Sequence, residues 1–297
     1  MQHQSIAHAT LPHPPTLSAS EMAKPRIHLV VCDNDGCLMP EHNSLLSPSD
    51  LAPIAAHNRS AHQALGVDDR FLSGKAGAPN PWTGLDWPRA ALPPLTICSG
   101  RPQPFVELLQ RSIHCPLLPA ISESGVITYS LADNVAHLDP TISAAHVAAI
   151  RACADWCAFE RGWNVQAGKQ AMVSLFVPDA DDRLFQQMME ECRRKIHDQA
   201  WPLRVDRTVT YINICLTHVS KATAVARLLR QLGLEGRNVL AIGDSTSDLV
   251  LRDVCGHFAC PANAVEEVKR VSDYITEAEL SKGVAEILRS YSLAGDP

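Results

Sequence analysis

Two hydrophobic runs of the sequence each end in a pair of carboxylates. The run IHLVVCD ends at Asp33, with Asp35 two positions later, and the run NVLAIGD ends at Asp244, with Asp248 four positions later. Residues i and i+2 of an extended segment point to the same side, so Asp33 and Asp35 are directed alike. Four gathered carboxylates would repel one another unless a cation compensates. Because all the ligands are oxygens, the pattern favours Mg²⁺ together with a phosphate-bearing substrate.

Two other short stretches carry groups suited to an anion. Ser99 and Gly100 follow the hydrophobic run LTIC, and a hydroxyl beside turn N–H groups can hold phosphate oxygens. Lys221 stands at the start of a helical pattern, where the helix dipole disfavours a cation. An anion in front of Lys221 explains that position. Taken alone, DNDG also fits a solvated acidic turn and GDSTSD a helix cap. Ser99 and Gly100 also fit a simple strand-to-helix turn, and Lys221 a solvated side chain.

The elements that must position these residues alternate between strand and helix at both ends of the chain. This order indicates an α/β fold with a doubly wound parallel sheet, in which ligands bind beyond the carboxyl ends of the strands. We expect strands at 27–33, 95–100, 117–122 and 238–244, and helices at 49–64, 104–112, 143–161 and 181–198. A further helix is expected to begin at Lys221 and to end at Gly236, and another to follow Asp244.

The middle of the chain has a different character and indicates an inserted α+β unit. We expect a disordered tail at 1–25, a catalytic core formed by 26–125 and 218–297, and a cap domain at 126–217. Within the core, 66–94 is rich in Gly, Pro and Trp without periodicity. A loop of that length inside a domain is uncommon and is often functional.

Composition excludes several classes of protein. The 297 residues carry a net charge of −6, whereas a general nucleic-acid binder normally has a basic surplus. No apolar run approaches the length needed to cross a bilayer, and the N-terminal residues lack the features of a secretory signal. We therefore expect a cytoplasmic protein with no nucleic-acid or membrane partner, and the oligomeric state stays open. The ten cysteines contain no CxxC pair and are expected to be free, buried thiols.

Taken in order, the four motifs are more specific than any one of them. They are DNDG (33–36), CSGR (98–101), SKA (220–222) and GDSTSD (243–248). This series resembles the haloacid dehalogenase-like phosphohydrolase superfamily over residues 27–288. The insert between the second and third motifs resembles the type-two cap of that superfamily. Its size is similar to the caps of the sucrose-phosphate, mannosyl-phosphoglycerate and archaeal-type phosphoglycolate phosphatase branches.

The resemblance implies a role for each motif residue. Asp33 would be the nucleophile that forms an aspartyl-phosphate, and Asp35 the general acid and base. Lys221 would offset the charge of Asp33 and the phosphate. Metal ligation would come from Asp33, Asp244, Asp248 and the backbone carbonyl of Asp35, and substrate or phosphate binding from Ser99, Gly100, Arg101, Lys221 and Asn263.

Three positions depart from the superfamily pattern. Cys37 stands where Thr or Val usually follows the first motif, and Ala222 replaces a Gly. Ser247 replaces an Asn whose amide often supports the metal or the substrate. In the cap, Lys169 and Arg204 are possible contacts to the leaving group, although a solvated face is the more expected place for both.

These observations predict a Mg²⁺-dependent phosphatase that acts on a small phosphorylated metabolite, either a sugar phosphate or a phospho-acid. His218 is expected to be structural or exposed, because this chemistry already has its acid and base. One alternative is a phosphomutase on the same scaffold, which would return the phosphoryl group to its substrate. Another is a non-catalytic protein that binds a metal or ligand. Release of inorganic phosphate separates the first reading from both alternatives.

Overall fold

The structure is a computed structural model with one unbroken sheet at its centre. The expected tail lies outside the described residues except for residue 25, as do residues 67–91 of the expected long loop. The described residues are 25–40, 45, 47–66, 92–115, 118–132, 134–177, 182–208 and 210–292.

The central sheet has five strands, all parallel. In spatial order the strands are β11 (Tyr274–Ile275), β10 (His257–Cys260), β9 (Val239–Ile242), β1 (Leu29–Cys32) and β2 (Leu95–Ile97). β1 and β9 are buried along their whole length, which explains why both appear in the sequence as continuous hydrophobic runs. Chain order reverses where β1 meets β9, so a crevice is expected beyond the carboxyl ends of these two strands. The predicted α/β fold class is confirmed.

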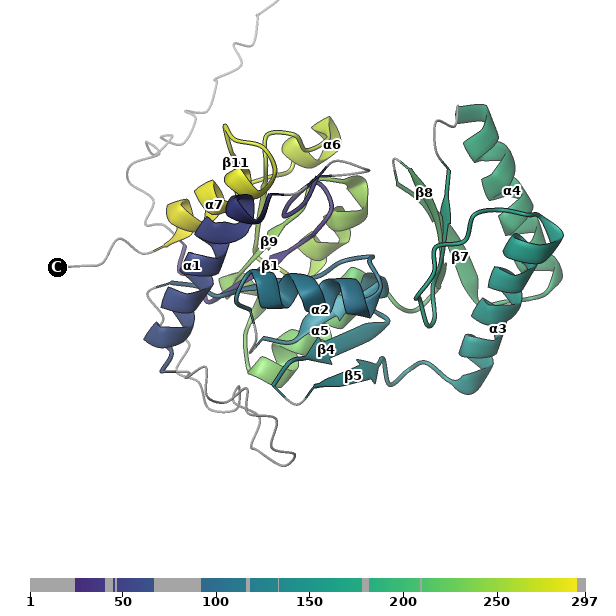
Figure 1. Cartoon of the computed structure of the whole chain (residues 1–297), viewed down its shortest axis with the longest axis horizontal. Coiled ribbons are helices and arrows are strands. Elements are labelled where there is room, and N and C mark those ends of the chain that lie inside the picture. The colour runs from purple at the N-terminus through teal and green to yellow at the C-terminus, as the bar shows by residue number, and fades with distance from the viewer. Residues whose placement is uncertain are drawn as a thin grey trace, which may run out of the picture.

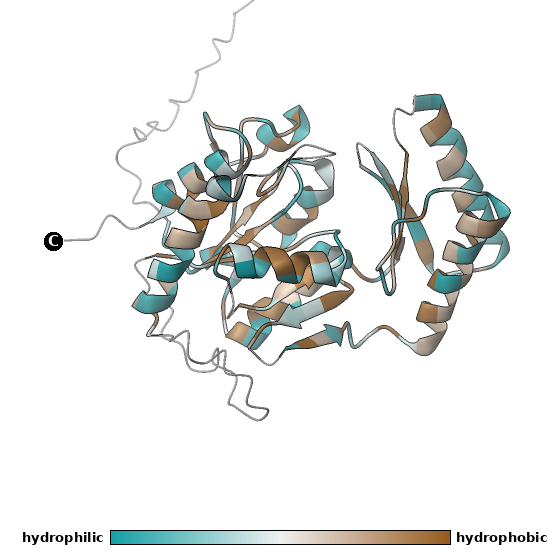
Figure 2. Cartoon of the chain, in the orientation of Figure 1, coloured by the Kyte–Doolittle hydropathy of each residue, from teal (hydrophilic) through white to brown (hydrophobic). Residues whose placement is uncertain are grey.

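Helices pack on the central sheet in two groups (Figure 1). The first group is α1 (Pro48–Ala64), α2 (Gln103–Ser112) and α7 (Leu280–Tyr291), and α1 contacts both of the others. The second group is α5 (Lys221–Leu232), η5 (Gly236–Asn238), η6 (Thr246–Asp253) and α6 (Glu266–Lys269), in which η6 contacts α5 and α6. The strands and the helix faces toward them form one hydrophobic cluster, and the sheet is mostly hydrophobic in Figure 2.

A three-stranded antiparallel sheet lies beside this core. It consists of β3 (Ala120–Ser122), β4 (Ile127–Ser130) and β5 (Val135–Leu138), with the short turn η3 (Glu123–Gly125) between the first two. A parallel bridge between Cys98 and Ile121 joins β3 to the strand end that follows β2. β4 was expected to open the inserted cap, yet it pairs with β3. The cap boundary at residue 126 stays a prediction.

A second antiparallel sheet and two helices form the other side of the molecule. The strands are β6 (Val173–Phe176), β8 (Tyr211–Leu216) and β7 (Leu203–Arg207), and the helical segments are α3 (Ala144–Asp155), η4 (Trp156–Glu160) and α4 (Asp182–Asp198). α3 contacts β6 and α4 contacts β7, and these elements share a second hydrophobic cluster. Figure 1 shows the helices on the side of this sheet that faces away from the core, so the sheet itself faces the core.

Most expected elements are present, and the differences have local causes. The helix that begins at Lys221 ends at Leu232 rather than near Gly236, because Gly233 adopts a left-handed conformation (φ 66°) that closes it. The segment after Asp244 is a 3₁₀ helix rather than an α-helix. β5 and β7 were not expected. All four residues of β5 are exposed, so that strand lacks the hydrophobic alternation that would reveal it.

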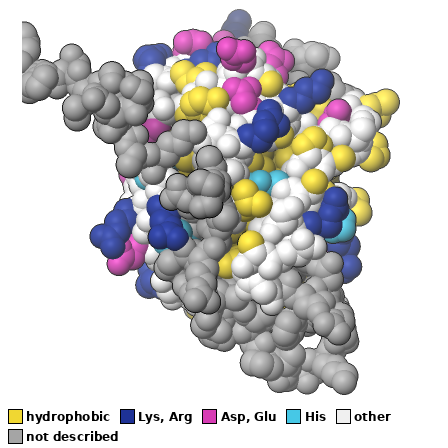
Figure 3. Space-filling model, turned by 90° about the vertical axis from the view of Figure 1, so that its left-hand side faces the viewer, with side chains coloured by type: hydrophobic (Ala, Val, Ile, Leu, Met, Phe, Trp, Pro, Cys, Tyr) yellow, Lys and Arg dark blue, Asp and Glu magenta, His cyan; other side chains and the backbone are white. Residues whose placement is uncertain are grey.

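Among the described residues, no helix is both long enough and apolar enough to span a membrane. Figure 3 looks onto the end of the molecule opposite the β6-β8-β7 sheet, and basic side chains on this face stand among acidic and hydrophobic ones. The expected absence of nucleic-acid and membrane partners stays a prediction. All ten cysteines are buried and free, as expected.

Candidate active site

A cavity of about 550 Å³ lies between the carboxyl ends of the central strands and the β6-β8-β7 sheet. The core contributes Asp33, Asp35 and Arg101 to its lining, and the opposite side contributes Lys169 and Tyr211. The cavity therefore lies at the reversal of strand order, where a doubly wound sheet binds its ligands. The motif residues and the insert face each other across it.

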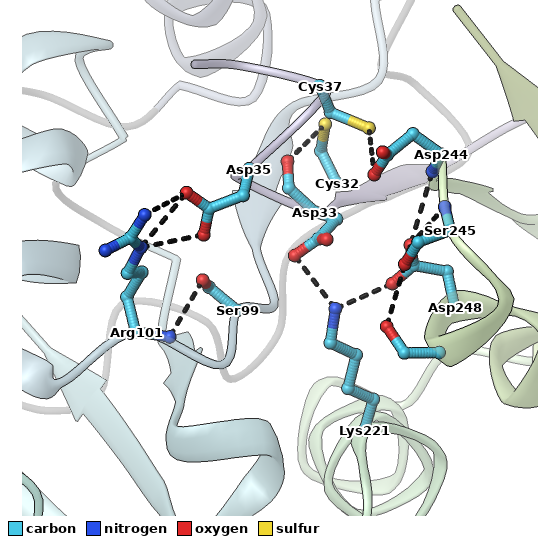
Figure 4. A network of polar contacts seen from close by, with 11 residues as sticks. Cys32, Asp33, Asp35, Cys37, Ser99, Arg101, Lys221, Asp244, Ser245 and Asp248 are labelled. Carbon is cyan, nitrogen blue, oxygen red and sulfur yellow. Dashed lines mark hydrogen bonds and ion pairs between the residues drawn. The ribbon is translucent and has the colours of Figure 1, made fainter. Parts of the chain in front are cut away.

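The centre of the site is an ammonium group held between two carboxylates (Figure 4). Nζ of Lys221 lies 2.8 Å from Oδ1 of Asp33 and 2.6 Å from Oδ1 of Asp248. All three residues are buried. Ser220 caps α5 through a reciprocal pair of hydrogen bonds with Thr223, and this fixes the turn from which Lys221 reaches toward β1.

Burial and charge oppose each other at these groups. Burial and the charge of Asp248 raise the pKa of Asp33 to about 7, although Lys221 acts in the opposite direction. Burial alone would lower the pKa of Lys221, but the charges of Asp248 and Asp33 outweigh it and hold that pKa well above its usual range. The two carboxylates thus favour the charged form of Lys221, while burial works against the ionised form of Asp33.

Three of the four motif carboxylates form a cluster that could hold a metal ion. Oxygen atoms of Asp33, Asp244 and Asp248 all lie within 4.8 Å of one another. Three carboxylates and the ammonium group of Lys221 leave two negative charges, which one divalent cation would neutralise. Because the donors are all oxygens, the residues present fit Mg²⁺. The side chain of Asp35 points away from this cluster, and its expected backbone contact to a metal stays a prediction.

The DNDG turn brings Asp244 against the backbone of the first motif. Gly36 has a φ of +76°, and a Cβ atom at that position would lie 2.1 Å from Oδ2 of Asp244. Only glycine combines this backbone conformation with such a close approach. The thiol of Cys37, which replaces the usual Thr or Val, lies 3.9 Å from Oδ1 of the same carboxylate. The departure at position 37 thus places a weak donor beside Asp244.

Asp35 is paired with Arg101. Nε of Arg101 donates to both carboxylate oxygens of Asp35, at 3.0 and 2.8 Å, and a terminal nitrogen donates to Oδ1 at 2.6 Å. These hydrogen bonds raise the pKa of Arg101. Its guanidinium group also lies over the rings of Phe105 in α2 and Tyr211 in β8. Arg101 therefore links the first motif, the second motif and the facing sheet.

The second motif is held by the turn after β3. The buried hydroxyl of Ser99 accepts a hydrogen bond from the N–H of Arg101, and the Ser99 carbonyl accepts one from the N–H of Ser124. A Cβ atom on Gly100 would lie 3.3 Å from Oγ of Ser124, so the two turns approach closely. Gly100 and Ser124 line the cavity. Sequence reasoning missed Ser124, although the SESG stretch after a predicted strand was the available signal.

The last motif forms a hydrogen-bonded loop around Asp248. Oδ2 of Asp248 accepts hydrogen bonds from the backbone N–H groups of Asp244 and Ser245, both at 3.2 Å, and from Oγ of Ser245 at 3.1 Å. Ser247, which replaces the usual Asn, lies 2.9 Å from Ser245 through their hydroxyls and lines the cavity. Asp248 therefore supports the loop and Lys221 together.

The amide group of Asn263 is hydrogen-bonded to two backbone groups of the core. Its amide nitrogen donates to the carbonyl of Gly36 at 2.8 Å, and its amide oxygen accepts from the N–H of Leu280 at 2.9 Å. Both amide groups are thus used to tie the first motif to the start of α7. Neither Asn263 nor Ser99 belongs to the described cavity lining, and the binding role of both stays a prediction.

The insert residues named from the sequence have distinct surroundings. Lys169 lines the cavity and is half-buried, rather than lying on a solvated face. Arg204 also lines it, but its guanidinium group donates to the carbonyls of Leu216 and Val219 at the exit from β8. His218 is exposed and contacts the ring of His146, consistent with a structural role.

Comparisons with known proteins match this picture. Residues 164–288 match a family model described as haloacid dehalogenase-like hydrolase. The chain is 30% identical over 113 residues to 5-amino-6-(5-phospho-D-ribitylamino)uracil phosphatase YcsE of Bacillus subtilis. This aligned stretch covers 38% of this chain and 44% of that protein. It is 38% identical over 73 residues to a phosphoglycolate phosphatase of Methanothermobacter thermautotrophicus, covering 25% of this chain and 33% of that protein. The matched stretches span less than half of either relative.

Solved structures extend the likeness to nearly the whole chain at the level of fold. Thermoplasma acidophilum 0175 aligns with a TM-score of 0.63 and 18% identity, covering 90% of this chain and 99% of that one. A haloacid dehalogenase-like hydrolase from Bacteroides thetaiotaomicron aligns with a TM-score of 0.61 and 17% identity, covering 89% and 99%. The predicted resemblance is confirmed: residues 164–288 match the haloacid dehalogenase-like hydrolase family, and the chain has the fold of such hydrolases.

Proposed function

We propose that this protein is a Mg²⁺-dependent phosphatase that hydrolyses a small phosphorylated metabolite through an aspartyl-phosphate on Asp33. The observation that carries the proposal is the contact of Lys221 with both Asp33 and Asp248 in a buried acidic cluster at the carboxyl ends of β1 and β9. A structural ion pair would not need a third carboxylate, Asp244, within the same cluster. The phosphatase names of the curated relatives support the same reading.

Asp33 is the group that attacks phosphorus. One carboxylate oxygen forms a bond to phosphorus as the ester oxygen departs with its bonding electrons. Asp35 gives the departing oxygen a proton. In the second half of the reaction, Asp35 takes a proton from water and the water oxygen bonds to phosphorus. The bond between phosphorus and the Asp33 oxygen then breaks, with its electrons returning to the carboxylate. Inorganic phosphate leaves, and both carboxyl groups return to their starting states.

The chain also supplies the charges that this transfer requires. Lys221 contacts Asp33 and would offset negative charge on the phosphoryl group, and the backbone N–H of Gly100, a residue of the cavity lining, would donate to a phosphate oxygen. Asp33, Asp244 and Asp248 would hold Mg²⁺. When bound, that ion neutralises the carboxylates and reduces their repulsion of an anionic substrate.

Arg101 sets a condition on the acid–base step. Both oxygens of Asp35 accept hydrogen bonds from Arg101 in this structure. Before Asp35 exchanges a proton with a leaving group, at least one of its oxygens must leave this pair. Substrate entry therefore repositions Arg101 or Asp35. A freed guanidinium group at that place would meet the substrate.

The proposed substrate class is a sugar phosphate or a phospho-acid, which the size of the cavity and the names of the two relatives support. A cytoplasmic location stays a prediction from the sequence.

The proposal is tested by phosphate release from a panel of phosphosugars, phosphoglycolate and phosphoglycerates. Wild-type protein with Mg²⁺ should release inorganic phosphate from at least one of them. Asp33→Asn should lower kcat by at least about 1000-fold, because an amide is not a nucleophile of comparable strength. EDTA should abolish turnover and added Mg²⁺ should restore it.

The matched control is Asp206→Asn, the same change at an exposed residue in the wall of the cavity. It should retain most of the activity. Turnover by Asp33→Asn at the wild-type rate would exclude Asp33 as the nucleophile. Indifference to EDTA would remove the metal from the scheme, and transfer of the phosphoryl group to a second hydroxyl without release would indicate a mutase.

A further inference from the structure

Lys169 is placed at the wall of the cavity by a polar network in the insert. Its Nζ donates to Oγ of Ser174 and lies 3.7 Å from the sulfur of Met172. Ser174 in turn donates to Oδ1 of Asn213, which lies on the neighbouring strand β8. A lysine ammonium group has three donor hydrogens, and this network uses one for Ser174 and at most one more for the weak acceptor Met172. At least one donor remains for a group in the cavity.

Among the described basic residues of the cavity lining, Lys169 is the half-buried one that lacks a carboxylate partner. Arg101 pairs with Asp35, and Lys221 pairs with Asp33 and Asp248. The remaining pairs in the wall are Arg204 with Asp206 and Arg207 with Asp182. Within the described part of the chain, no carboxylate lies within ion-pair distance of Lys169. Arg193 also lines the cavity without a described carboxylate partner, but it is exposed to solvent.

The loop that carries Lys169 is fixed to the core by Glu123. The carboxylate of Glu123 accepts hydrogen bonds from the N–H of Gln170, at 3.0 and 2.9 Å, and from the N–H of Ala171, at 3.1 Å. Glu123 is buried and has a φ of 49°, an uncommon conformation for a residue with a side chain. The backbone N–H of Glu123 donates to the carbonyl of Arg101. The position of Lys169 is therefore coupled to the loop of the second motif.

We propose that Lys169 binds a carboxylate on the leaving group, so that the protein prefers phosphorylated carboxylic acids to neutral phosphate esters of the same size. This inference rests on the proposed function, because it assumes that the phosphoryl group lies at Asp33. A half-buried cation without an ion-pair partner is stabilised by a ligand of opposite charge. The single positive charge of the ammonium group is balanced by the single negative charge of a carboxylate. A second phosphate group carries a charge of about −2, which would lie close to Asp35 and Glu123.

The electrostatics at Lys169 support this assignment. Burial lowers the pKa of Lys169 to about 8, while nearby Cys215, Glu123 and Asp35 raise it and Arg101 lowers it further. A bound carboxylate would stabilise the charged form. Above about pH 8 the free side chain loses its proton, so the preference for acids should be larger near pH 7 than near pH 9.5.

The test compares binding of two esters that differ in one group. Phosphoglycolate carries a carboxylate where 2-hydroxyethyl phosphate carries a hydroxymethyl group. Affinities are measured by titration calorimetry with Mg²⁺ in the Asp33→Asn background, where turnover does not interfere. We expect this protein to bind phosphoglycolate about 10- to 100-fold more tightly than 2-hydroxyethyl phosphate. Adding Lys169→Met should remove that preference, and adding Lys169→Arg should keep part of it.

Arg193→Met is the matched control, because it removes an exposed cation from the same wall. It should leave the preference within about twofold of the starting protein. Equal binding of the two esters, or a preference that survives Lys169→Met, would overturn the inference. If the esters bind with the expected preference but wild-type protein never hydrolyses them, the proposed function fails while the role of Lys169 in binding stands.

Discussion

At the scale of single residues, the site is governed by an imbalance of charge. Asp33, Asp244 and Asp248 lie within 4.8 Å of one another, the one ammonium group of Lys221 contacts only Asp33 and Asp248, and burial raises the pKa of Asp33 to about 7. A nucleophilic carboxylate must be ionised to react. The ionised form of Asp33 therefore needs further stabilisation. A divalent cation would supply positive charge, and nearby hydrogen-bond donors would add to it. The need to balance these negative charges is the physical reason why carboxylates at the ends of neighbouring strands predict a metal site.

Gly36 offers a direct test of that geometry. Gly36→Ala would place a Cβ atom 2.1 Å from Oδ2 of Asp244, so the carboxylate or the turn must shift. Since a displacement of about 1 Å can cost about 100-fold in rate, kcat/KM should fall by about that factor.

Gly66→Ala is the matched control for this substitution. Gly66 has a similar φ of +70°, but nothing lies within 4 Å of its added Cβ. Both variants carry the same kind of backbone strain, and the loss of activity should be confined to Gly36→Ala. Equal kinetics for the two variants would mean that the contact between Gly36 and Asp244 does not matter for the reaction.

The residues that follow strands or begin helices could be predicted because their positions depend on local sequence. Asp33, Asp244 and Lys221 belong to this group, and the structure places them together. The pairing of Asp35 with Arg101 could not be predicted, because it depends on side-chain directions across 66 positions. The contacts of Asn263 are a similar case. An Asn after a strand can face a ligand or a neighbouring turn, and its sequence position is the same in both cases.

At the scale of elements, the turn η3 connects the two sides of the cavity. Its first residue, Glu123, accepts hydrogen bonds from the loop that precedes β6, and its second residue, Ser124, donates to the carbonyl of Ser99. The turn contains successive left-handed residues, which a sequence pattern does not reveal without a glycine at each position. The turn was therefore missed, whereas the buried strands β1 and β9 were found from their hydrophobic runs.

Glu123→Gln tests this connection. The amide keeps the size of the side chain, but it has one acceptor oxygen where the carboxylate has two, and that oxygen carries no full charge. The loop of Lys169 should be held less firmly. The preference for phosphoglycolate over 2-hydroxyethyl phosphate should fall about 3- to 10-fold in the calorimetric comparison, with a much smaller change for the neutral ester.

A structural role alone would give a different result for Glu123→Gln. Loss of stability without a role in positioning Lys169 would weaken binding of both esters equally. Thermal unfolding of the variant and of wild-type protein separates general destabilisation from the expected selective effect.

At the scale of the whole molecule, two hydrophobic clusters face each other across the cavity. One surrounds the central parallel sheet, and the other lies between the β6-β8-β7 sheet and its two helices. Strand and helix alternation predicted the α/β core with its parallel sheet, and the change of pattern in the middle of the chain predicted an α+β insert. The contacts between the two sides were not predictable, because the position of Arg101 over the ring of Tyr211 depends on how the two hydrophobic clusters are placed relative to each other. Under the proposed function, those contacts would decide which substrate group lies near which side chain.

The central claim is that Asp33 receives the phosphoryl group of the substrate. The most direct test is acid quenching of wild-type protein during turnover of the best substrate, followed by mass spectrometry of the peptide that contains residues 33–36. We predict a phosphoryl group on Asp33 that is absent from Asp33→Asn protein and from protein treated with EDTA. Release of phosphate with Asp33 unmodified at every quench time, or with the label on a different residue, would contradict the account.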